Sequence, residues 1–246
     1  RKFSSVCWLP QREYFLREYR LVQKDGRIVK NHIPAADFVP FVMDFSDLVW
    51  PGEEFHGTVL EDLECYTEYI PREAWQSVFN ANITGVGHHM LTQFDRAGSS
   101  MPEAKRKACD FMNKPEWAER ILAAALPHDV AVSAAYVSYK TIDRWWIIKE
   151  DLCLWDATFH GYWFDETLKT STPDVLVSWY DLPEGVAYRK LIIASNFSRK
   201  DAPLGIANLP FPNGALRELW GGADVSVQDL QSLTVPAKKF VLIGVK

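Results

Sequence analysis

Residues 46–56 read SDLVWPGEEFH, and this stretch sets the pattern that the first two thirds of the chain follow. The apolar segment at residues 46–50 is typical of a short strand, which Pro51-Gly52 ends. Two carboxylates, Glu53 and Glu54, come directly after the turn. Further strands are predicted on both sides of this stretch, at residues 27–32 (RIVKNH), 85–94 (GVGHHMLTQF) and 129–137 (DVAVSAAYV).

Helical patterns separate these strands. Apolar spacing, or a proline suited to the first helical turn, predicts helices at residues 10–24, from Pro71, at 102–112, at 115–125, and at 141–152 with Thr141 as the cap. Alternating strands and helices predict a parallel sheet with helical crossovers. Only three or four such units fit before residue 165, whereas a closed barrel needs eight. The pattern leaves two alternatives, an open doubly wound sheet or half of a barrel.

The helical period disappears after residue 165. Short apolar segments separated by Pro, Gly, Asn and Asp predict strands at residues 174–182, 188–197, 203–209, 216–222 and 238–246. Strands this short and regularly spaced are typical of a small antiparallel β-sandwich. Both faces of the last segment are apolar, so we expect it to be a central or covered strand.

Composition narrows the classes of partner. The 246 residues include 27 basic and 32 acidic side chains, and the net charge of −5 argues against nucleic acid or an anionic membrane as the main partner. No apolar run approaches the ~20 residues that cross a bilayer. The sequence has no phosphate-binding loop, no His-Glu-x-x-His helix, no complete dinucleotide-binding turn and no Cys-x-x-Cys pair. We therefore expect neither a cofactor nor a metal ion.

Polar side chains gather where the predicted strands end, and parallel α/β folds bind ligands beyond the carboxyl ends of their strands. Four successive elements carry them, and the residues are His32, Glu53 with Glu54, Gln93, and His128 with Asp129. Trp50 and Tyr66 lie nearby in the sequence, and aromatic rings suit hydrophobic cores as well as the faces of sugars. Together these residues predict a sugar or polyol pocket.

Glu53 and Glu54 are the candidate catalytic residues. Cleavage of a glycosidic bond needs a proton donor at the leaving oxygen and a second group on the other side of the anomeric carbon. Adjacent residues on extended backbone point to opposite sides, so at most one of the two glutamates is catalytic. A partner carboxylate must then come from another strand. A solvated turn, or a glutamate that only holds a sugar hydroxyl, is the alternative interpretation.

Several short motifs extend over nearly the whole chain. They are Asp47-Leu-Val-Trp-Pro-Gly-Glu-Glu-Phe-His56, Tyr66-Thr-Glu-Tyr-Ile-Pro71 with Trp75 four residues later, Leu126-Pro-His128-Asp129, Tyr162-Trp163, and Val235-Pro-Ala-Lys-Lys-Phe240-Val-Leu-Ile243. In these motifs the chain resembles the C-terminal part of large glycoside-hydrolase-like proteins. These proteins are relatives of glycoside hydrolase family 123 and are common in gut and soil bacteria.

The resemblance implies a (β/α)₈ barrel followed by a β-sandwich, acting on carbohydrate, and it adds Asp47 to the substrate-binding candidates. Residues 1–165 would be the C-terminal β/α units of the barrel and residues 166–246 the sandwich. Family 123 itself would bring an adjacent Asp-Glu pair and hydrolysis of N-acetylhexosaminides assisted by the sugar's acetamido group. The one such dipeptide, Asp165-Glu166, lies at the expected domain junction. The catalytic pair is then expected upstream of Arg1, or the chemistry differs.

We therefore expect an α/β fold, a partial (β/α) barrel followed by a small antiparallel β-sandwich, in a fragment of an enzyme that hydrolyses glycosidic bonds. A non-catalytic carbohydrate-binding or structural module is the alternative. Half a barrel would leave two strand edges unpaired, so we expect chains to pair there, or residues 1–10 and 96–114 to cover them. Activity of the chain alone and its oligomeric state stay open. A periplasmic or secreted bacterial protein would suit the resemblance.

Overall fold

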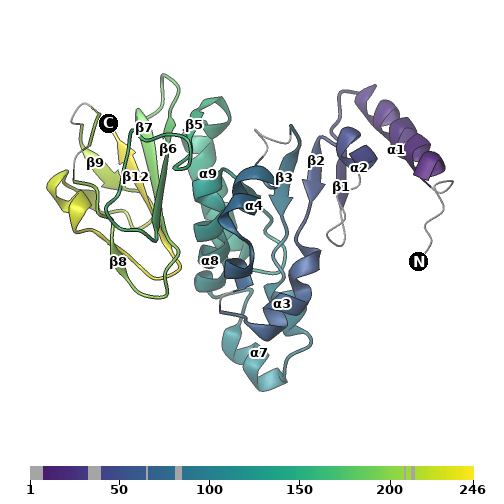
Figure 1. Cartoon of the computed structure of the whole chain (residues 1–246), viewed down its shortest axis with the longest axis horizontal. Helices are drawn as coiled ribbons and strands as arrows, with labels where there is room; N and C mark the ends of the chain where they lie inside the picture. Colours follow the sequence, from purple (N-terminus) through teal and green to yellow (C-terminus); the bar gives the residue numbers. More distant parts are fainter. Residues whose placement is uncertain (1–7, 33–39, 65, 81–84, 208, 212–213) are drawn as a thin grey trace.

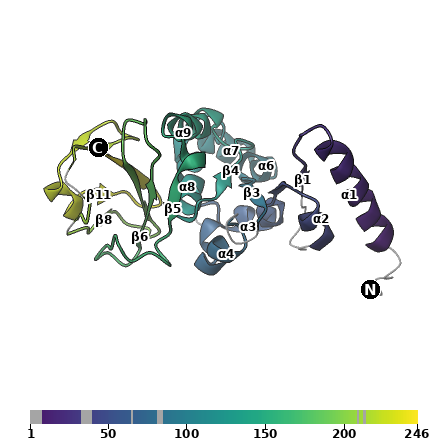
Figure 2. The ribbon, with the colours of Figure 1, turned by 90° about the horizontal axis from the view of Figure 1, so that it is seen from above.

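The protein has a mixed α/β fold with two sheets arranged along its long axis (Figure 1). The computed structural model describes residues 8–32, 40–64, 66–80, 85–207, 209–211 and 214–246, without the side chains of residues 8, 9, 40, 41, 66 and 67. Helix α1 (Trp8–Gln23) lies at one end, a parallel sheet follows it, and an antiparallel sheet forms the other end. Helices α8 (Pro115–Ala125) and α9 (Tyr139–Asp151) lie between the two sheets in both views (Figures 1 and 2).

The first sheet is parallel, as the alternation of strands and helices predicts. Within the described residues it has four strands in the order β1-β2-β3-β4, which are Lys30–His32, Leu48–Trp50, Gly87–Met90 and Ala131–Val132. Each strand is shorter than its apolar segment. The amide of Leu91, just after β3, donates to the carbonyl oxygen of Pro51 at 2.8 Å and extends the contact between β2 and β3. The spatial order of the strands follows their order in the sequence.

Short helices connect these strands. They are α2 (Pro40–Asp44), α3 (His56–Glu61), α4 (Arg72–Ser77), α6 (Phe94–Gly98) and α7 (Glu103–Cys109), with 3₁₀ turns η2 (Glu53–Phe55), η3 (Tyr66–Tyr69), η4 (Leu126–His128) and η5 (Leu154–Asp156). Pro71 precedes α4 and Pro115 begins α8, because proline fits the first helical turn. Helix α9 begins before the expected cap. The hydroxyl of Thr141 lies inside the helix and donates to the hydroxyl oxygen of Ser138 at 3.0 Å.

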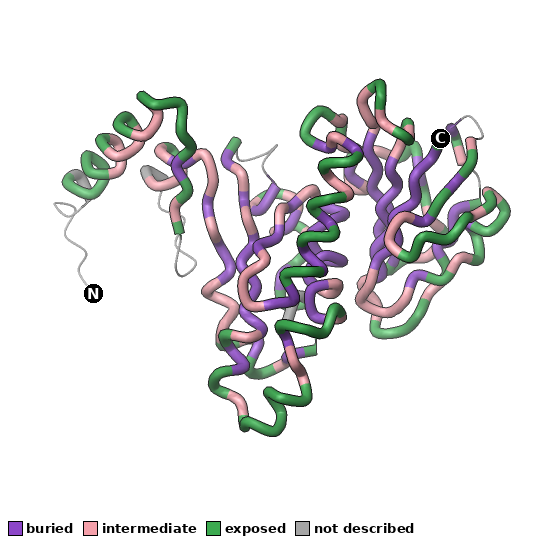
Figure 3. The backbone as a smooth tube through the Cα atoms, turned by 180° about the vertical axis from the view of Figure 1, so that it is seen from behind, coloured by how far each residue is buried: buried purple, intermediate pink, exposed green. Residues whose placement is uncertain are grey.

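The two faces of the parallel sheet differ in burial because successive side chains of a strand point to opposite sides. Met90 and Val132 lie on the buried face, in one core with Val59 of α3 and Ile121 of α8. The opposite face carries Lys30, His32, Trp50 and His89, which are partly or largely exposed. Buried segments concentrate around α8 and in the antiparallel sheet, whereas the described side chains of α1 include no buried one (Figure 3).

The second sheet is antiparallel, and its described strands run in the order β10-β9-β12-β7-β6-β5. Their bounds are β5 (Thr158–His160), β6 (Val175–Asp181), β7 (Lys190–Asn196), β9 (Leu216–Glu218), β10 (Asp224–Val225) and β12 (Phe240–Val245). A two-stranded ribbon of β8 (Ala202–Pro203) and β11 (Thr234–Val235) lies beside it, together with the turn η6 (Gln228–Gln231). The sheet begins at Thr158, which is earlier than the change of pattern at residue 165.

Strand β12 is central, as its two apolar faces predict. It pairs with β7 on one side and β9 on the other, and all six of its residues are buried. Leu242 faces the core that contains α8, whereas Ile243 faces a second core with Leu204 and Leu230. The antiparallel sheet is therefore covered on both sides.

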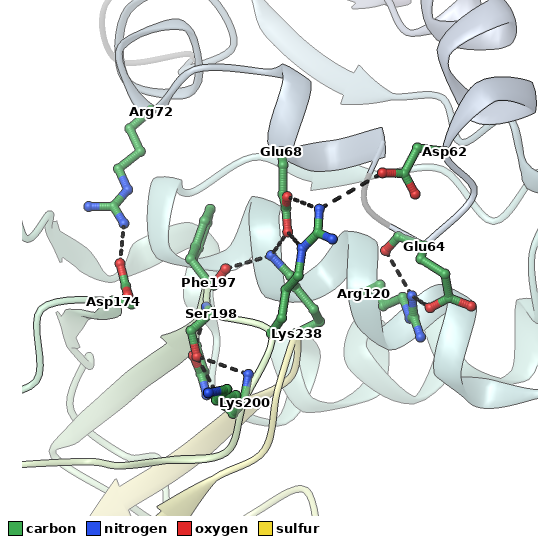
Figure 4. Close-up of polar contacts among 12 residues, drawn as sticks. Asp62, Glu64, Glu68, Arg72, Arg120, Asp174, Phe197, Ser198, Lys200 and Lys238 are labelled. Atoms are coloured by element: carbon green, nitrogen blue, oxygen red, sulfur yellow. Dashed lines mark hydrogen bonds and ion pairs between the residues drawn. The ribbon is translucent and has the colours of Figure 1, made fainter.

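Helix α8 joins the two halves of the molecule. Ile121 and Leu122 share one core with Leu191 of β7 and Leu242 of β12. Ion pairs flank this core, where Glu68 of η3 contacts Arg199 at 2.9 Å and also Lys238 (Figure 4). The Lys238 ammonium also donates to the carbonyl oxygen of Phe197 at 2.5 Å. The antiparallel sheet is thus held against the parallel part by a shared core and by ion pairs, and not by the connecting chain alone.

Two of the cysteines, Cys109 and Cys153, are free thiols, and Cys7 and Cys65 lie outside the described residues. Across the helices of the described segments, none has the length and apolar character that a bilayer crossing requires.

Candidate functional site

Three loops meet at the carboxyl edge of the parallel sheet. The amide of Leu91, just after β3, donates to Pro51 O after β2, and the amide of Ser133, just after β4, donates to Met90 O, each at 2.8 Å. The amide of Asp95 in α6 donates to Tyr136 O at 2.9 Å. These backbone bonds hold the segments after β2, β3 and β4 together, so side chains from separate parts of the sequence converge on one edge.

Glu53 lies at the centre of this convergence. Its Oε2 is 3.2 Å from Nε2 of His32 at the end of β1, and its Oε1 is 3.2 Å from Nη2 of Arg96 in α6. Nη1 of Arg96 in turn donates to the hydroxyl oxygen of Tyr136 at 3.5 Å. We call these four residues the edge site. The side chain of Glu53 is 27% exposed, so solvent and a ligand can both reach the carboxylate.

Glu53 lies between two basic side chains. The hydrogen bond to Tyr136, followed by the charges of Tyr136 and Glu53, raises the pKa of Arg96 above its ordinary value, so this partner is a permanent cation. His32 adds a second positive partner whenever it is protonated. Charge-assisted contacts of this kind are shorter and stronger than neutral ones. These contacts hold the carboxylate in place between the end of β1 and α6.

Glu54 makes a different contact from Glu53. Its Oε2 accepts a hydrogen bond from the amide of Gly52 at 2.9 Å, which braces the turn after β2. Both glutamates lie in the 3₁₀ turn η2 and not on extended backbone. In a 3₁₀ turn, successive side chains point about a third of a turn apart. The structure therefore separates the two candidates and places only Glu53 in the edge site.

An aromatic and basic group adjoins the edge site on the exposed face of the sheet. The ring of Trp50 lies 5.8 Å from that of His32, and Nζ of Lys30 lies 4.3 Å above the Trp50 ring. Lys30 Nζ also donates to Nδ1 of His89 at 2.8 Å, while Nε2 of His89 donates to the carbonyl oxygen of Val132 at 3.0 Å. Because Nε2 carries the proton in this arrangement, Nδ1 is free to accept. Burial, and next the charge of Lys30, lower the pKa of His89.

Gln93 lies at the predicted strand end but inside the protein. Its side chain is fully buried, and neither its amide nitrogen nor its amide oxygen has a hydrogen-bond partner among the residues that the structure describes. The neighbouring Asp95 pairs with Arg106 at 3.2 Å. The Gln93 amide is therefore buried and is not exposed at the edge site. The carboxylate of Asp95 is paired with Arg106 and not with an edge-site residue.

Asp47 lies at the opposite, amino edge of the sheet, because it precedes β2. Its carboxylate accepts hydrogen bonds from the side chains of Tyr19 and Gln23 and from the amide of Val29. It therefore ties α1 and the start of β1 to the sheet. The side chain of Tyr66 lies outside the described residues, although its backbone begins η3.

His128 and Asp129 also lie away from the edge site. They precede β4 instead of following it, so they do not share the carboxyl edge with Glu53. His128 is fully buried, with Nδ1 bonded to Ala124 O at 2.7 Å and Nε2 to the hydroxyl of Tyr162 at 3.0 Å. Oδ1 of Asp129 accepts a bond of 2.6 Å from the hydroxyl of Tyr180 in β6. Both residues are part of the junction between the two halves.

Lys30, His89, Arg96 and Tyr136 were not among the site residues expected from the sequence. The position of Lys30 could have been predicted, because Lys30 and His32 are two residues apart on a strand and must share a face. The positions of Arg96 and Tyr136 could not, since each comes from a loop whose path depends on long-range backbone bonds. Tyr136 also has a positive φ of 64°, which is unusual for a residue with a side chain and often marks functional sites.

Asp165-Glu166, the dipeptide that matches the family pair by letters, is engaged within the second half of the chain. Asp165 accepts a bond of 2.7 Å from Nδ1 of His160, and Glu166 pairs with Lys169. In the described segments, no three His, Cys, Asp or Glu side chains come together as a metal ion requires. Comparison of the sequence with models of known protein families gives no match, and none of the curated proteins matches it.

Proposed function

We propose that this chain is part of a carbohydrate-active enzyme that hydrolyses glycosidic bonds at the edge site. The observation that carries the proposal is the placement of Glu53 between His32 and Arg96, beside Trp50, at the carboxyl edge of a parallel sheet. Parallel α/β folds bind their substrates at this edge. An aromatic ring for the apolar face of a sugar and a carboxylate for its hydroxyls or its positive charge are the groups that such a substrate needs.

The strand order supports half of a barrel over a doubly wound sheet. A doubly wound sheet reverses its strand order at a switch point, whereas consecutive strands of a barrel are always neighbours. The described strands run β1-β2-β3-β4 without reversal. In the same proposal, the antiparallel sheet together with the β8–β11 ribbon corresponds to the C-terminal β-sandwich.

Within this proposal Glu53 acts as the ionised member of the site. It faces the anomeric carbon and takes a proton from the water molecule that attacks this carbon as the bond to the leaving oxygen breaks. The proton for the leaving oxygen must come from another group. His32 can supply it through Nδ1 while Nε2 remains bonded to Glu53, which keeps the imidazole oriented.

Replacing Glu53 by Gln, with Glu54→Gln as the matched control, tests the proposal. The two variants remove the same charge one residue apart, but only the first touches the edge site. We expect Glu53→Gln to lower hydrolysis of p-nitrophenyl glycosides by about 10²–10⁴-fold and Glu54→Gln to change it by a small factor only. The measurement is made on the natural gene product that contains this chain.

Two results would contradict the hydrolytic role. The first is Glu53→Gln activity within a factor of a few of the wild type. The second is sugar binding without turnover in the wild type on every p-nitrophenyl glycoside, and this result would favour the non-catalytic module.

A further inference from the structure

A cavity lies where the two halves of the molecule meet. It has a volume of about 640 Å³ and is lined by residues of both halves, among them Asp129, Lys149, Trp155, Trp163, Phe164 and Tyr180. We call it the junction cavity. None of the edge-site residues lines it. Sites for small molecules commonly measure about 300–1,000 Å³ and lie preferentially between domains.

Aromatic rings form most of its apolar wall. Trp163 and Phe164 meet edge to face at 5.2 Å, and Phe159 packs on Tyr180 at 5.0 Å. Trp155 and Phe164 nevertheless remain 65% and 58% exposed. Large exposed aromatic side chains gathered around one hollow leave apolar surface in water, and such surface commonly marks a binding site.

The polar wall is preorganised. The hydroxyl of Tyr180, itself buried, donates to Oδ1 of Asp129 at 2.6 Å and holds that carboxylate in place. Burial, and next the negative charge of Asp129, raise the pKa of Tyr180, so the phenol keeps the proton that it donates. Asp129 has a positive φ of 57° because it ends the turn η4 in the left-handed conformation, which Asp tolerates better than most residues.

The charges of the cavity indicate a neutral ligand. Asp129 supplies one negative charge and Lys149 one positive charge, while Asn80 and Thr158 add uncharged polar groups. A phosphorylated or otherwise strongly anionic molecule would meet only one cation there. Flat aromatic faces combined with a carboxylate, an amide, a hydroxyl and an ammonium group match a ring with apolar C–H faces and a rim of hydroxyls.

We propose that the junction cavity is a second carbohydrate site, which binds a neutral pyranose ring stacked on Trp155. Asp129 and Lys149 bind its hydroxyls. The proposal is independent of the hydrolytic role of Glu53, because the cavity and the edge site share no residue.

The test measures binding of four neutral disaccharides, namely cellobiose, maltose, lactose and N,N′-diacetylchitobiose, with adenosine as a flat non-carbohydrate probe. Titrations followed by tryptophan fluorescence and saturation-transfer NMR use the whole chain at ligand concentrations in the mM range, where a single sugar site of about 4 kcal/mol is half filled. We expect at least one disaccharide to bind and Trp155→Ala to weaken it about tenfold or more.

Tyr139→Ala serves as the matched control, because Tyr139 is similarly exposed but does not line the cavity. It should leave the affinity unchanged. Three outcomes would overturn the proposal: no disaccharide binds, adenosine binds as tightly as every disaccharide, or affinity is kept in Trp155→Ala. Since Trp155 is largely exposed, its replacement is expected to leave the fold intact.

Discussion

Gly52 sets the direction of the backbone that carries Glu53. Its φ of +118° lies in a region that side chains rarely adopt, and a Cβ at this position would overlap the carbonyl oxygen of Leu91. Only glycine allows the close approach of the β2 and β3 loops on which the edge site depends. The Pro51-Gly52 pair is therefore more than a strand terminator, because it also positions the residue that follows.

Replacing Gly52 by Ala should both destabilise the protein and impair the edge site. We expect a loss of about 1–3 kcal/mol in the free energy of unfolding, measured by urea denaturation, because of backbone strain and the clash with Leu91. Gly57→Ala is the control. Gly57 lies in α3 with open space around it, so alanine there should stabilise the helix by about 1 kcal/mol. Equal effects of the two substitutions would contradict this account of Gly52.

Ion pairs connect η3 with the loops of the antiparallel sheet. Glu68 contacts Arg199 and Lys238, and the side chain of Lys238 is only 13% exposed (Figure 4). A cation this close to burial depends on its partner more than a surface lysine does. Asp62 lies 3.9 Å from Arg199 and extends the network to the end of α3.

Glu68→Gln should weaken this contact between elements. We expect the free energy of unfolding to fall by about 1 kcal/mol in low salt and by less at high salt, because ions screen the part of the interaction that is exposed. Glu166→Gln removes a charge from a pair that is almost entirely in solvent, and it should leave the free energy of unfolding essentially unchanged. A salt-independent loss in Glu68→Gln would argue for lost packing instead of lost charge.

His128 lies at the contact between the two halves of the molecule. Its ring stacks on Trp75 of α4 and on Trp163, and it bonds to Tyr162, while α8 connects the same region to β7 and β12. Burial lowers the pKa of His128 from 6.5 to about 4, and burial does the same for His88 on the buried face of the parallel sheet. Both histidines therefore remain neutral in the folded protein at neutral pH.

Stability should consequently fall as the pH falls from about 6.5 towards 4. In this range the unfolded chain binds protons at His128 and His88 that the folded protein does not, so the free energy of unfolding decreases with decreasing pH. Each histidine contributes up to about 3 kcal/mol over the full range. His128→Gln should remove about half of this pH dependence in urea titrations from pH 7 to pH 4.5. An unchanged slope in the variant would show that His128 is not the group responsible.

The class of each half follows from the pattern of residues along the chain. The period of apolar residues is a local property of the chain, so it predicts that the first part alternates strands and helices and that residues 174–182, 188–197 and 238–246 form strands. The sequence also places polar residues after the first three strands. The ends of these elements were less predictable, because they depend on backbone bonds to segments far away in the sequence.

Which polar residues meet depends instead on how the chain folds in space. Glu53 and Asp129 both flank a strand, but one follows its strand and the other precedes it, so in a parallel sheet they lie at opposite edges. Arg96 and Tyr136 reach Glu53 through the bonds between three loops, and no local pattern encodes that meeting. Side-chain convergence depends on distances through space, whereas the pattern of a sequence records only distances along the chain.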